Sequence, residues 1–249
     1  MTRSSKRITA IRLRGVSKRY ESNGRAYPAL TDVDFEAYRG NLHLLLGPSG
    51  SGKTTLLTVA AGFVAPTAGS VEIFGEALYG RDPGELQLLR AATIGFIFQS
   101  FLLIDGLSVA ENVALQLRFA GVTNGAARRR TREALERVGI DGLAEKRPAE
   151  LSHGERQRIA IARALAIDAD VLIADEPTAS LDAEQGESII RFLHTCATDL
   201  YKCVIVASHD LRLRPYADEV VTMVGGRIAG RVHPQEERQH SGIVHAAVA

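Results

Sequence analysis

The chain has 249 residues, enough to bury one large core or two small ones. It is 45% hydrophobic and 24% charged, as ordinary globular proteins are, and its net charge of +1 gives no general attraction to nucleic acid. No apolar run approaches the length of about 18 residues that a membrane-spanning helix needs, and the basic N-terminus lacks the apolar segment of a signal peptide. Cys196 and Cys203 lack metal-ligand spacing and predict core side chains in a reducing compartment. We therefore expect a soluble cytoplasmic protein that reaches a membrane only through a partner.

The first part of the chain has the pattern of half-exposed strands. Apolar and polar residues alternate over residues 8–14 and again over residues 32–35. Tyr20 lies between them in a stretch rich in turn-forming residues. Its ring can stack on a purine or pack in a core, and the pattern favours neither.

A glycine-rich stretch between a predicted strand (42–46) and a predicted helix (53–61) is the most informative feature. Its spacing fits the phosphate-binding pattern G-x-x-x-x-G-K-[ST]. Backbone amides and a helix N-terminus attract phosphate, Lys53 can reach the β- and γ-phosphates, and the Thr54 hydroxyl can ligate Mg²⁺. The predicted nucleotide-binding residues are Gly47, Pro48, Ser49, Gly50, Ser51, Gly52, Lys53, Thr54 and Thr55. We therefore expect the chain to bind a nucleoside triphosphate.

Polar side chains follow three further apolar runs, where α/β folds place ligand contacts. Gln99 follows the first run, Asp175 and Glu176 the second, and His209 the third. Asp175 suits Mg²⁺, which takes oxygen ligands, and Glu176 can polarise a water for attack on the γ-phosphate. Asp182 follows shortly after Glu176, just before another predicted helix.

Residues 105–150 have the pattern of an inserted helical subdomain. Ser108 and Glu111 form a capping box at the start of its first predicted helix. The second predicted helix, over about 126–138, carries the run Arg128-Arg129-Arg130-Thr131-Arg132. Such a run is compatible with a solvated helix face and with contact to lipid headgroups or an acidic partner loop.

A second capped helix start follows this region. Ser152 and Glu155 form a capping box before a helix predicted over 156–166, and Gly154 lies between them. A capped helix start with a glycine and a small hydroxyl is a second possible phosphate site, although an ordinary N-cap explains the same residues. The last pattern is a hairpin over residues 220–231, and we assign no structure to the polar tail from His233.

Strands that alternate with helices predict an α/β fold with a mostly parallel sheet, preceded by an antiparallel β portion. In this order the motifs resemble those of an ATP-binding cassette (ABC) ATPase over residues 8–231. The matching segments are Walker A (47–54), the Q-loop (Gln99), the signature (from Leu151), Walker B (171–176), the D-loop (ending at Asp182) and the switch histidine (His209). The resemblance implies a single P-loop NTPase domain, with a helical subdomain at about 100–165 inserted in a RecA-like core. It also implies flexible tails at 1–7 and 232–249.

The resemblance implies roles for the residues within one subunit. Tyr20 would stack on adenine, and Asp175 would bind Mg²⁺. Gln99 would contact Mg²⁺ and the attacking water and would sense the transport partner. Glu176 would be the general base, and His209 would contact the γ-phosphate.

In this family two subunits enclose two ATP molecules, so Ser152, Gly154 and Asp182 would act on the nucleotide of the other subunit. The signature departs from the usual L-S-G-G-Q, since His153 replaces the first glycine and Glu155 the glutamine. Glu155 keeps the capping box, and we expect it to be tolerated. His153 either crowds the site or adds a donor toward the γ-phosphate. We expect tolerance, with an effect on the hydrolysis rate and none on ATP binding.

Residues 94–101 and 111–113 resemble the branch that serves lipoprotein release, macrolide-type export and a cell-division complex. The resemblance implies ATP and Mg²⁺ as cofactors, a homodimer, and a separate integral membrane permease at the inner face of the plasma membrane. It further implies export or extrusion of a lipid-linked or amphipathic substrate. The alternative is a regulatory ATPase that signals through a membrane partner without transport. A non-transport ATPase acting on ribosomes or DNA is disfavoured by the single cassette, and no nucleic-acid partner is expected.

Overall fold

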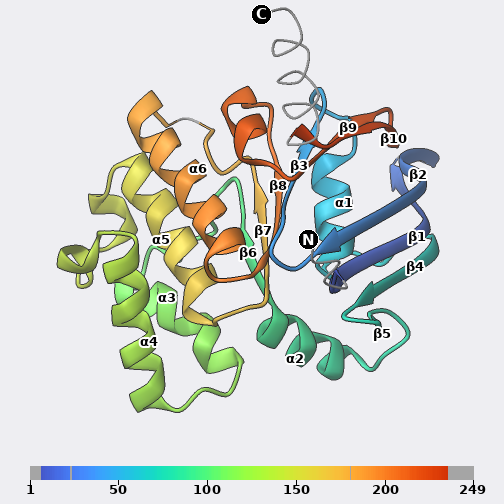
Figure 1. The fold of residues 1–249 in the computed structure, drawn as a ribbon. Helices are drawn as coiled ribbons and strands as arrows, with labels where there is room; N and C mark the ends of the chain where they lie inside the picture. The colour runs from blue at the N-terminus through green and yellow to red at the C-terminus, as the bar shows by residue number, and fades with distance from the viewer. Residues whose placement is uncertain (1–6, 23, 180, 235–249) are drawn as a thin grey trace, which may run out of the picture.

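A computed structural model of the chain describes residues 7–22, 24–179 and 181–234. Most of the two predicted tails, residues 1–6 and 235–249, lies outside these residues, as does Ser180 in the D-loop. The described strands form two sheets, with helices between and beside them (Figure 1). Within the described part of the chain, no helix is long and apolar enough to cross a membrane.

The N-terminal sheet is antiparallel, as the alternating pattern predicts. Its strands lie in the order β2-β1-β4-β5, with bounds β1 Thr9–Ser22, β2 Arg25–Tyr38, β4 Ala68–Ile73 and β5 Glu76–Ala77. The expectation of a turn-rich stretch around Tyr20 is wrong, because β1 continues through it to Ser22. Register shifts along the β1–β2 pair break the alternation there, so the sequence pattern hides the strand.

The second sheet is parallel except for one edge strand. Its order is β10-β9-β3-β8-β7-β6, and only β10 runs antiparallel to its neighbour. The bounds are β3 Leu42–Leu46, β6 Ile94–Ile97, β7 Val171–Asp175, β8 Cys203–Ala207, β9 Glu219–Val224 and β10 Arg227–Val232. The strands β6, β7 and β8 are buried throughout, as a parallel sheet covered on both faces requires.

Helices cover both faces of the parallel sheet and divide its core into two clusters (Figure 1). On one side, α1 packs between this sheet and the antiparallel sheet, with Leu56 and Leu57 fully buried. On the other side lie α3, α4, α5 and α6. The helix bounds are α1 Lys53–Ala60, α2 Pro83–Thr93, α3 Val109–Phe119, α4 Asn124–Arg137, α5 His153–Ala166 and α6 Ala183–Thr198, with short 3₁₀ helices at Asp141–Leu143, Pro148–Glu150 and Leu211–Tyr216.

Both predicted capping boxes are confirmed. The Ser108 hydroxyl accepts from the Glu111 amide, and the Glu111 carboxylate accepts from the Ser108 amide at 2.8 Å. The same exchange begins α5, where the Glu155 carboxylate accepts from the Ser152 amide at 2.7 Å. These caps satisfy amide groups that the first turn of a helix leaves unpaired. The sequence pattern therefore located both helix starts to within a few residues.

Helix α2 was not predicted. Its N-cap is Asp82, whose carboxylate accepts from the Gly84 amide, and Pro83 occupies the first helical position. None of its residues, all of them described, is fully buried, and its apolar stripe is weak, with Leu86 and Leu89 only half-buried against the core. The Asp-Pro start was the available signal.

Candidate functional site

The glycine-rich loop joins β3 to α1, as its sequence context predicts. The Ser51 amide donates to the Pro48 carbonyl at 3.2 Å, which closes a turn inside the loop. The Gly226 amide, at the tip of the β9–β10 hairpin, donates to the Ser51 carbonyl at 2.9 Å. The hairpin therefore holds the loop from the side.

Only glycine fits at two positions of the loop, because other backbone atoms lie very close to them. A Cβ atom on Gly47 would lie 2.4 Å from the Met223 carbonyl oxygen, and one on Gly52 would lie 2.6 Å from the Ala29 carbonyl oxygen. Gly52 also has φ of +100° and is the N-cap of α1, where no described side chain caps the helix. The first amides of α1 thus remain available to an anion, which the helix dipole also attracts.

One cavity of about 360 Å³ is lined by the loop and by residues that come shortly after β6, β7 and β8. Its predicted lining residues are Ser49, Gly50, Ser51, Gly52, Lys53, Thr54, Thr55, Gln99, Glu176 and His209, and the structure adds Ala29 from β2. Gln99 lies after β6, Glu176 after β7 and His209 after β8. Parallel strands end at one edge of a sheet, so residues far apart in sequence converge there.

Lys53 is held inside the loop. Its side chain is 8% exposed, and Nζ donates to the carbonyl oxygens of Gly47 at 2.7 Å and Pro48 at 3.2 Å. Gly47 and Pro48 themselves do not line the cavity. A buried ammonium group bound only to neutral carbonyls is a strong partner for a negatively charged ligand.

Asp175 has an unusual environment for a carboxylate. It is 5% exposed, and its Oδ1 has no hydrogen-bond partner among the described residues. Burial raises its pKa, and the hydrogen bond from the Thr54 hydroxyl only partly opposes this shift. A buried carboxylate oxygen without a partner, next to a hydroxyl and below the phosphate loop, fits a hard divalent cation such as Mg²⁺.

Glu176 and His209 form a pair at the open side of the cavity. His209 Nδ1 lies 2.9 Å from Glu176 Oε2, and the Ser208 hydroxyl donates to the same oxygen at 3.3 Å. The Glu176 side chain is 14% exposed and the His209 side chain 75% exposed. The backbone of Glu176 has φ of +49°, which is unusual for a residue with a side chain, and its amide is fixed by the Ala207 carbonyl at 2.8 Å. The His209 ring and the Ser208 hydroxyl therefore position the carboxylate, and the bond to Ala207 fixes the backbone that carries it.

Besides Gly47 and Pro48, four predicted nucleotide contacts do not line this cavity, namely Tyr20, Ser152, Gly154 and Asp182. Tyr20 lies on β1 opposite Tyr27 of β2 and is 42% exposed, with Lys18 Nζ 5.2 Å from its ring centroid. The β1–β2 hairpin reaches the loop through Ala29, so Tyr20 lies on the hairpin that borders the site. The sequence pattern gave no reason to single out Tyr27, which is also exposed.

Ser152 and Asp182 are both helix N-caps. The Asp182 carboxylate accepts from the Gln185 amide at 2.8 Å at the start of α6. Gln185 also faces the signature, since a Cβ on Gly154 would lie 2.0 Å from its Oε1. Two hydrogen bonds from Ser152 lower the pKa of Glu155, and the bond from the Ser152 amide has a larger effect than the bond from its hydroxyl. The starts of α5 and α6 thus meet at Gln185, a contact between distant segments that no sequence pattern signals.

His153 packs within its own chain. Its ring lies against Phe101 in an edge-to-face arrangement, with ring centroids 4.7 Å apart and an interplanar angle of 69°. Phe101 follows Gln99 closely and has φ of +60°, and the next residue, Leu102, has φ of +48°. Arg163 of α5 donates to both of their carbonyl oxygens, at 2.6 and 2.7 Å. The signature helix and the Q-loop are therefore joined by a ring contact and a guanidinium fork.

Comparisons with known proteins identify the family of the chain. Residues 30–179 match the family described as ABC transporter. The chain is 36% identical to the uncharacterized ABC transporter ATP-binding protein Mb2593 of Mycobacterium bovis, over 90% of this chain and 68% of that protein. It is 38% identical to the macrolide export ATP-binding/permease protein MacB 1/2 of Paracoccus denitrificans, over 88% of this chain and only 32% of that much longer protein.

A solved structure has the same fold. It is described as the dimeric structure of a post-hydrolysis state of the ATP-binding cassette MJ0796 bound to ADP and Pi. The match has a TM-score of 0.85 and 33% identity, and it covers 90% of this chain and 98% of that one. Family and fold therefore agree: the chain belongs to the ABC transporter ATP-binding family and is an ATPase that binds ATP.

Proposed function

We propose that the chain is the ATP-hydrolysing subunit of a bacterial exporter, in which two copies enclose two ATP molecules and drive a membrane permease. One observation carries this proposal. The cavity gathers the phosphate loop, Gln99, Glu176 and His209, whereas Ser152 and Gly154 of the described chain lie outside its lining. One copy therefore has two helix starts that can bind an anion, the start of α1 at this cavity and the start of α5 outside it. A head-to-tail pair of copies requires this arrangement, because the start of α5 in one copy then serves the cavity of the other.

Within one copy, the loop amides and Lys53 bind the β- and γ-phosphates. Thr54, Asp175 and Gln99 would hold Mg²⁺, which when bound neutralises part of the phosphate charge. Glu176 takes a proton from the attacking water. The oxygen of that water bonds to the γ-phosphorus while the bond from the γ-phosphorus to the bridging oxygen breaks, which leaves ADP and phosphate. His209, 2.9 Å from the Glu176 carboxylate, orients this base and reaches toward the γ-phosphate.

The second copy completes the site. Its Ser152 hydroxyl, its Gly154 amide and the start of its α5 approach the γ-phosphate from the side opposite the loop, and its Asp182 lies beside them. The capping box supports this role, because it fixes the first turn of α5 before any ligand arrives. The solved relative is described as a dimer bound to ADP and Pi, which also supports pairing.

A groove next to Gln99 supports docking of the permease. Its volume is about 360 Å³, and aromatic and aliphatic side chains dominate its lining, among them Phe63, Phe98, Leu102 and Phe119. Leu102 is 55% exposed and Phe119 61% exposed, which is costly for large apolar side chains unless a partner covers them. We assign the groove to a short apolar cytoplasmic segment of the permease, which places the protein at the inner face of the plasma membrane. The name of the macrolide-export relative supports export of an amphipathic molecule.

The test of pairing uses Glu176→Gln, which keeps the hydrogen-bonding shape and removes the base. We expect turnover to fall by about 100-fold or more, the lower range for loss of a general base, while ATP binding persists and an ATP-dependent dimer accumulates. In this background Ser152→Arg should abolish the dimer and leave ATP binding by the single copy intact. Ser70→Arg, at an exposed position of β4, is the matched control and should still dimerise. Loss of ATP binding by the Ser152→Arg monomer would contradict the model of a shared site.

The regulatory alternative uses the same site and the same groove, with signalling through the membrane subunit in place of transport. Reconstitution of the chain with its membrane subunit in vesicles separates the two. Export requires that release of an amphipathic molecule rises with ATP turnover, and that Glu176→Gln stops both. Turnover without any coupled release would favour the regulatory role.

A further inference from the structure

Helix α4 carries a basic surface that the nucleotide site does not use. Between Asn124 and Arg137 it has five arginines and two glutamates, a net charge of +3. A single stripe of this helix is buried, at Ala127, Thr131, Ala134 and Leu135. The arginines occupy the remaining positions around the helix, namely Arg128, Arg129, Arg130, Arg132 and Arg137, which we call the α4 basic surface.

The two glutamates do not neutralise this surface. Arg129 pairs with Glu133 at 3.8 Å and Arg132 with Glu136 at 3.6 Å, with the arginine side chains 65% and 71% exposed. Such exposed pairs contribute little and exchange readily with other anions. Within the described part of the chain, neither Arg128 nor Arg130 takes part in an ion pair. The charge is therefore available to a partner.

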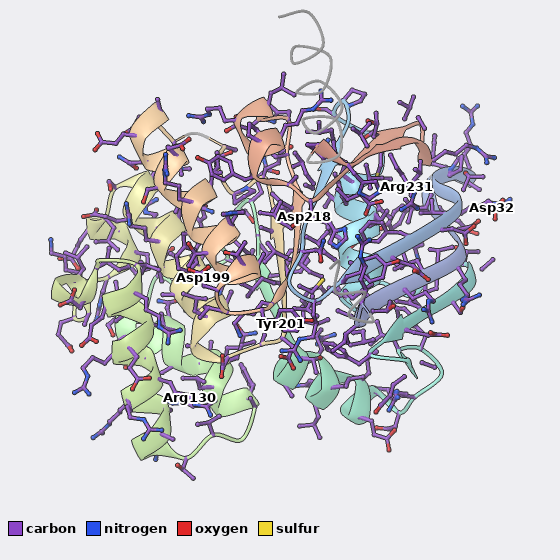
Figure 2. The ribbon with its side chains drawn as sticks, in the orientation of Figure 1. Asp32, Arg130, Asp199, Tyr201, Asp218 and Arg231 are labelled. Atoms are coloured by element: carbon purple, nitrogen blue, oxygen red, sulfur yellow. The ribbon has the colours of Figure 1, made fainter. Side chains whose placement is uncertain are left out.

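The position of α4 relates this charge to the permease groove. Helix α4 begins at Asn124, five residues after Phe119, which lines the groove at the end of α3. The Val122 amide donates to the Leu117 carbonyl at 3.0 Å, so the connection folds back tightly and α4 packs on α3. Figure 1 shows α2 and the start of α4 toward the same end of the molecule, and Figure 2 shows Arg130 on the lower part of α4.

We propose that the α4 basic surface binds anionic phospholipid headgroups beside the docked permease. This inference rests on the proposed function, since a groove that receives a permease segment faces the membrane. The first arginines lie about 6 to 12 Å along α4 from its start, by the helical rise per residue, and about 10 Å is the range of electrostatic attraction at moderate salt. A shallow hollow of about 250 Å³ between Arg129, Arg130 and Arg137 has room for a phosphate group.

A lipid surface fits these charges better than an acidic protein segment does. The arginines are spread around the whole exposed half of a 14-residue helix rather than gathered along one groove. A flat anionic surface can engage such a spread, because each charge interacts independently with headgroups that move freely. An acidic peptide instead needs a row of charges aligned with its own, and the arginines of α4 do not form one.

The test measures co-sedimentation of the full chain with vesicles of phosphatidylcholine that contain about 30% phosphatidylglycerol, against vesicles of phosphatidylcholine alone. We expect binding only to the anionic vesicles. Arg128→Gln/Arg132→Gln should weaken it by about 25-fold, since each basic residue at an anionic surface contributes about fivefold. Arg14→Gln/Arg191→Gln, two exposed arginines with the same total charge change, should stay within about twofold of the parent.

Two further measurements keep the outcome clear. ATP affinity should be unchanged in both double variants, which shows that they fold. Parent binding should fall steeply between about 0.05 M and 0.5 M NaCl, because salt screens exposed charges. Equal loss in the two double variants, equal binding to neutral vesicles, or no vesicle binding at low salt would overturn the inference, as would capture by polyglutamate in place of vesicles. A chain that binds anionic vesicles through α4 but fails to dimerise with ATP would contradict the proposed function and leave this inference standing.

Discussion

Replacing Asp175 with asparagine should raise the stability of the ligand-free chain and lower the stability that Mg²⁺ and ATP together add. The two effects have opposite signs, which makes the prediction demanding. Both effects follow from one observation: the Asp175 carboxylate is 5% exposed, and its Oδ1 has no hydrogen-bond partner among the described residues. The charge is costly to the fold alone and useful only once a cation arrives.

The sign of the first effect follows from the pKa. Burial raises the pKa of Asp175 in the folded chain, so the folded chain holds this proton more tightly than the unfolded chain does. Its contribution to stability is therefore largest at low pH and is lost as pH rises through the folded pKa. At neutral pH the ionised group carries a penalty that asparagine removes. We expect a gain of about 1 kcal/mol, the low end for a buried unpaired polar group, because the amide is itself polar. For a chain of this size that is a rise in Tm of about 2 to 4 °C.

The second effect appears when nucleotide is added. A ligand at 100 times its Kd adds about 2.7 kcal/mol to the stability of the parent. The variant should gain much less from ATP with Mg²⁺, and about as much as the parent from ATP with a chelator. Thermal unfolding of the parent and of the variant is measured without ligand, with ATP and Mg²⁺, and with ATP and a chelator. Asp141→Asn, at an exposed aspartate, is the control that should change neither effect. A ligand-free variant less stable than the parent, or an undiminished response to Mg²⁺, would refute the reasoning.

Three other predictions use single sites. Tyr20→Ala should weaken ATP binding by about tenfold, within the range for loss of base stacking, while Tyr27→Ala on the opposite strand should not; equal effects in an equilibrium titration would remove Tyr20 from the adenine site. Burial alone would raise the pKa of Glu219, but hydrogen bonds from His43 and Arg231 outweigh burial and lower that pKa. The free energy of unfolding measured in urea should therefore be retained above pH 4.5 and fall below it. Glu219→Gln should show a flatter dependence on pH. Arg163→Lys should cost about 1 to 3 kcal/mol of unfolding free energy and speed hydrogen exchange over residues 99–103, because lysine cannot bond both carbonyl groups; unchanged exchange there would contradict the clamp.

Much of the lining of the cavity beside the glycine-rich loop could be predicted from the sequence, because its parts are local patterns at strand ends. The loop from Gly47 needs only its own spacing and its flanking strand and helix to be recognised. Gln99, Glu176 and His209 each follow a run of apolar residues, and the parallel arrangement of those runs is enough to bring them to one edge. The same logic located both capping boxes.

The parts that escaped prediction depend on contacts between distant segments or on weak patterns. Helix α2 buries none of its described residues, and β1 has register shifts where its alternation fails near Tyr20. The Gln185 contact with Gly154 joins the starts of two helices, and no local pattern encodes it. The orientation of His153 toward Phe101 likewise depends on the path of the Q-loop, which only the folded chain defines.

That path gives the Q-loop three different neighbours within four residues. Gln99 lines the nucleotide cavity, the Phe101 ring packs on His153 of the signature helix, and Leu102 lines the groove that we assign to the permease. Phe101 and Leu102 are both in the left-handed backbone region, a conformation that costs about 1 to 3 kcal/mol per residue and persists only where other contacts impose it. The bonds from Arg163 to their carbonyl groups are such contacts. We expect a segment that fills the groove and displaces Leu102 to disturb the Phe101–His153 contact and the position of Gln99 together. At a position where the family usually has glycine, the ring of His153 adds a contact between the signature helix and the segment that borders the groove.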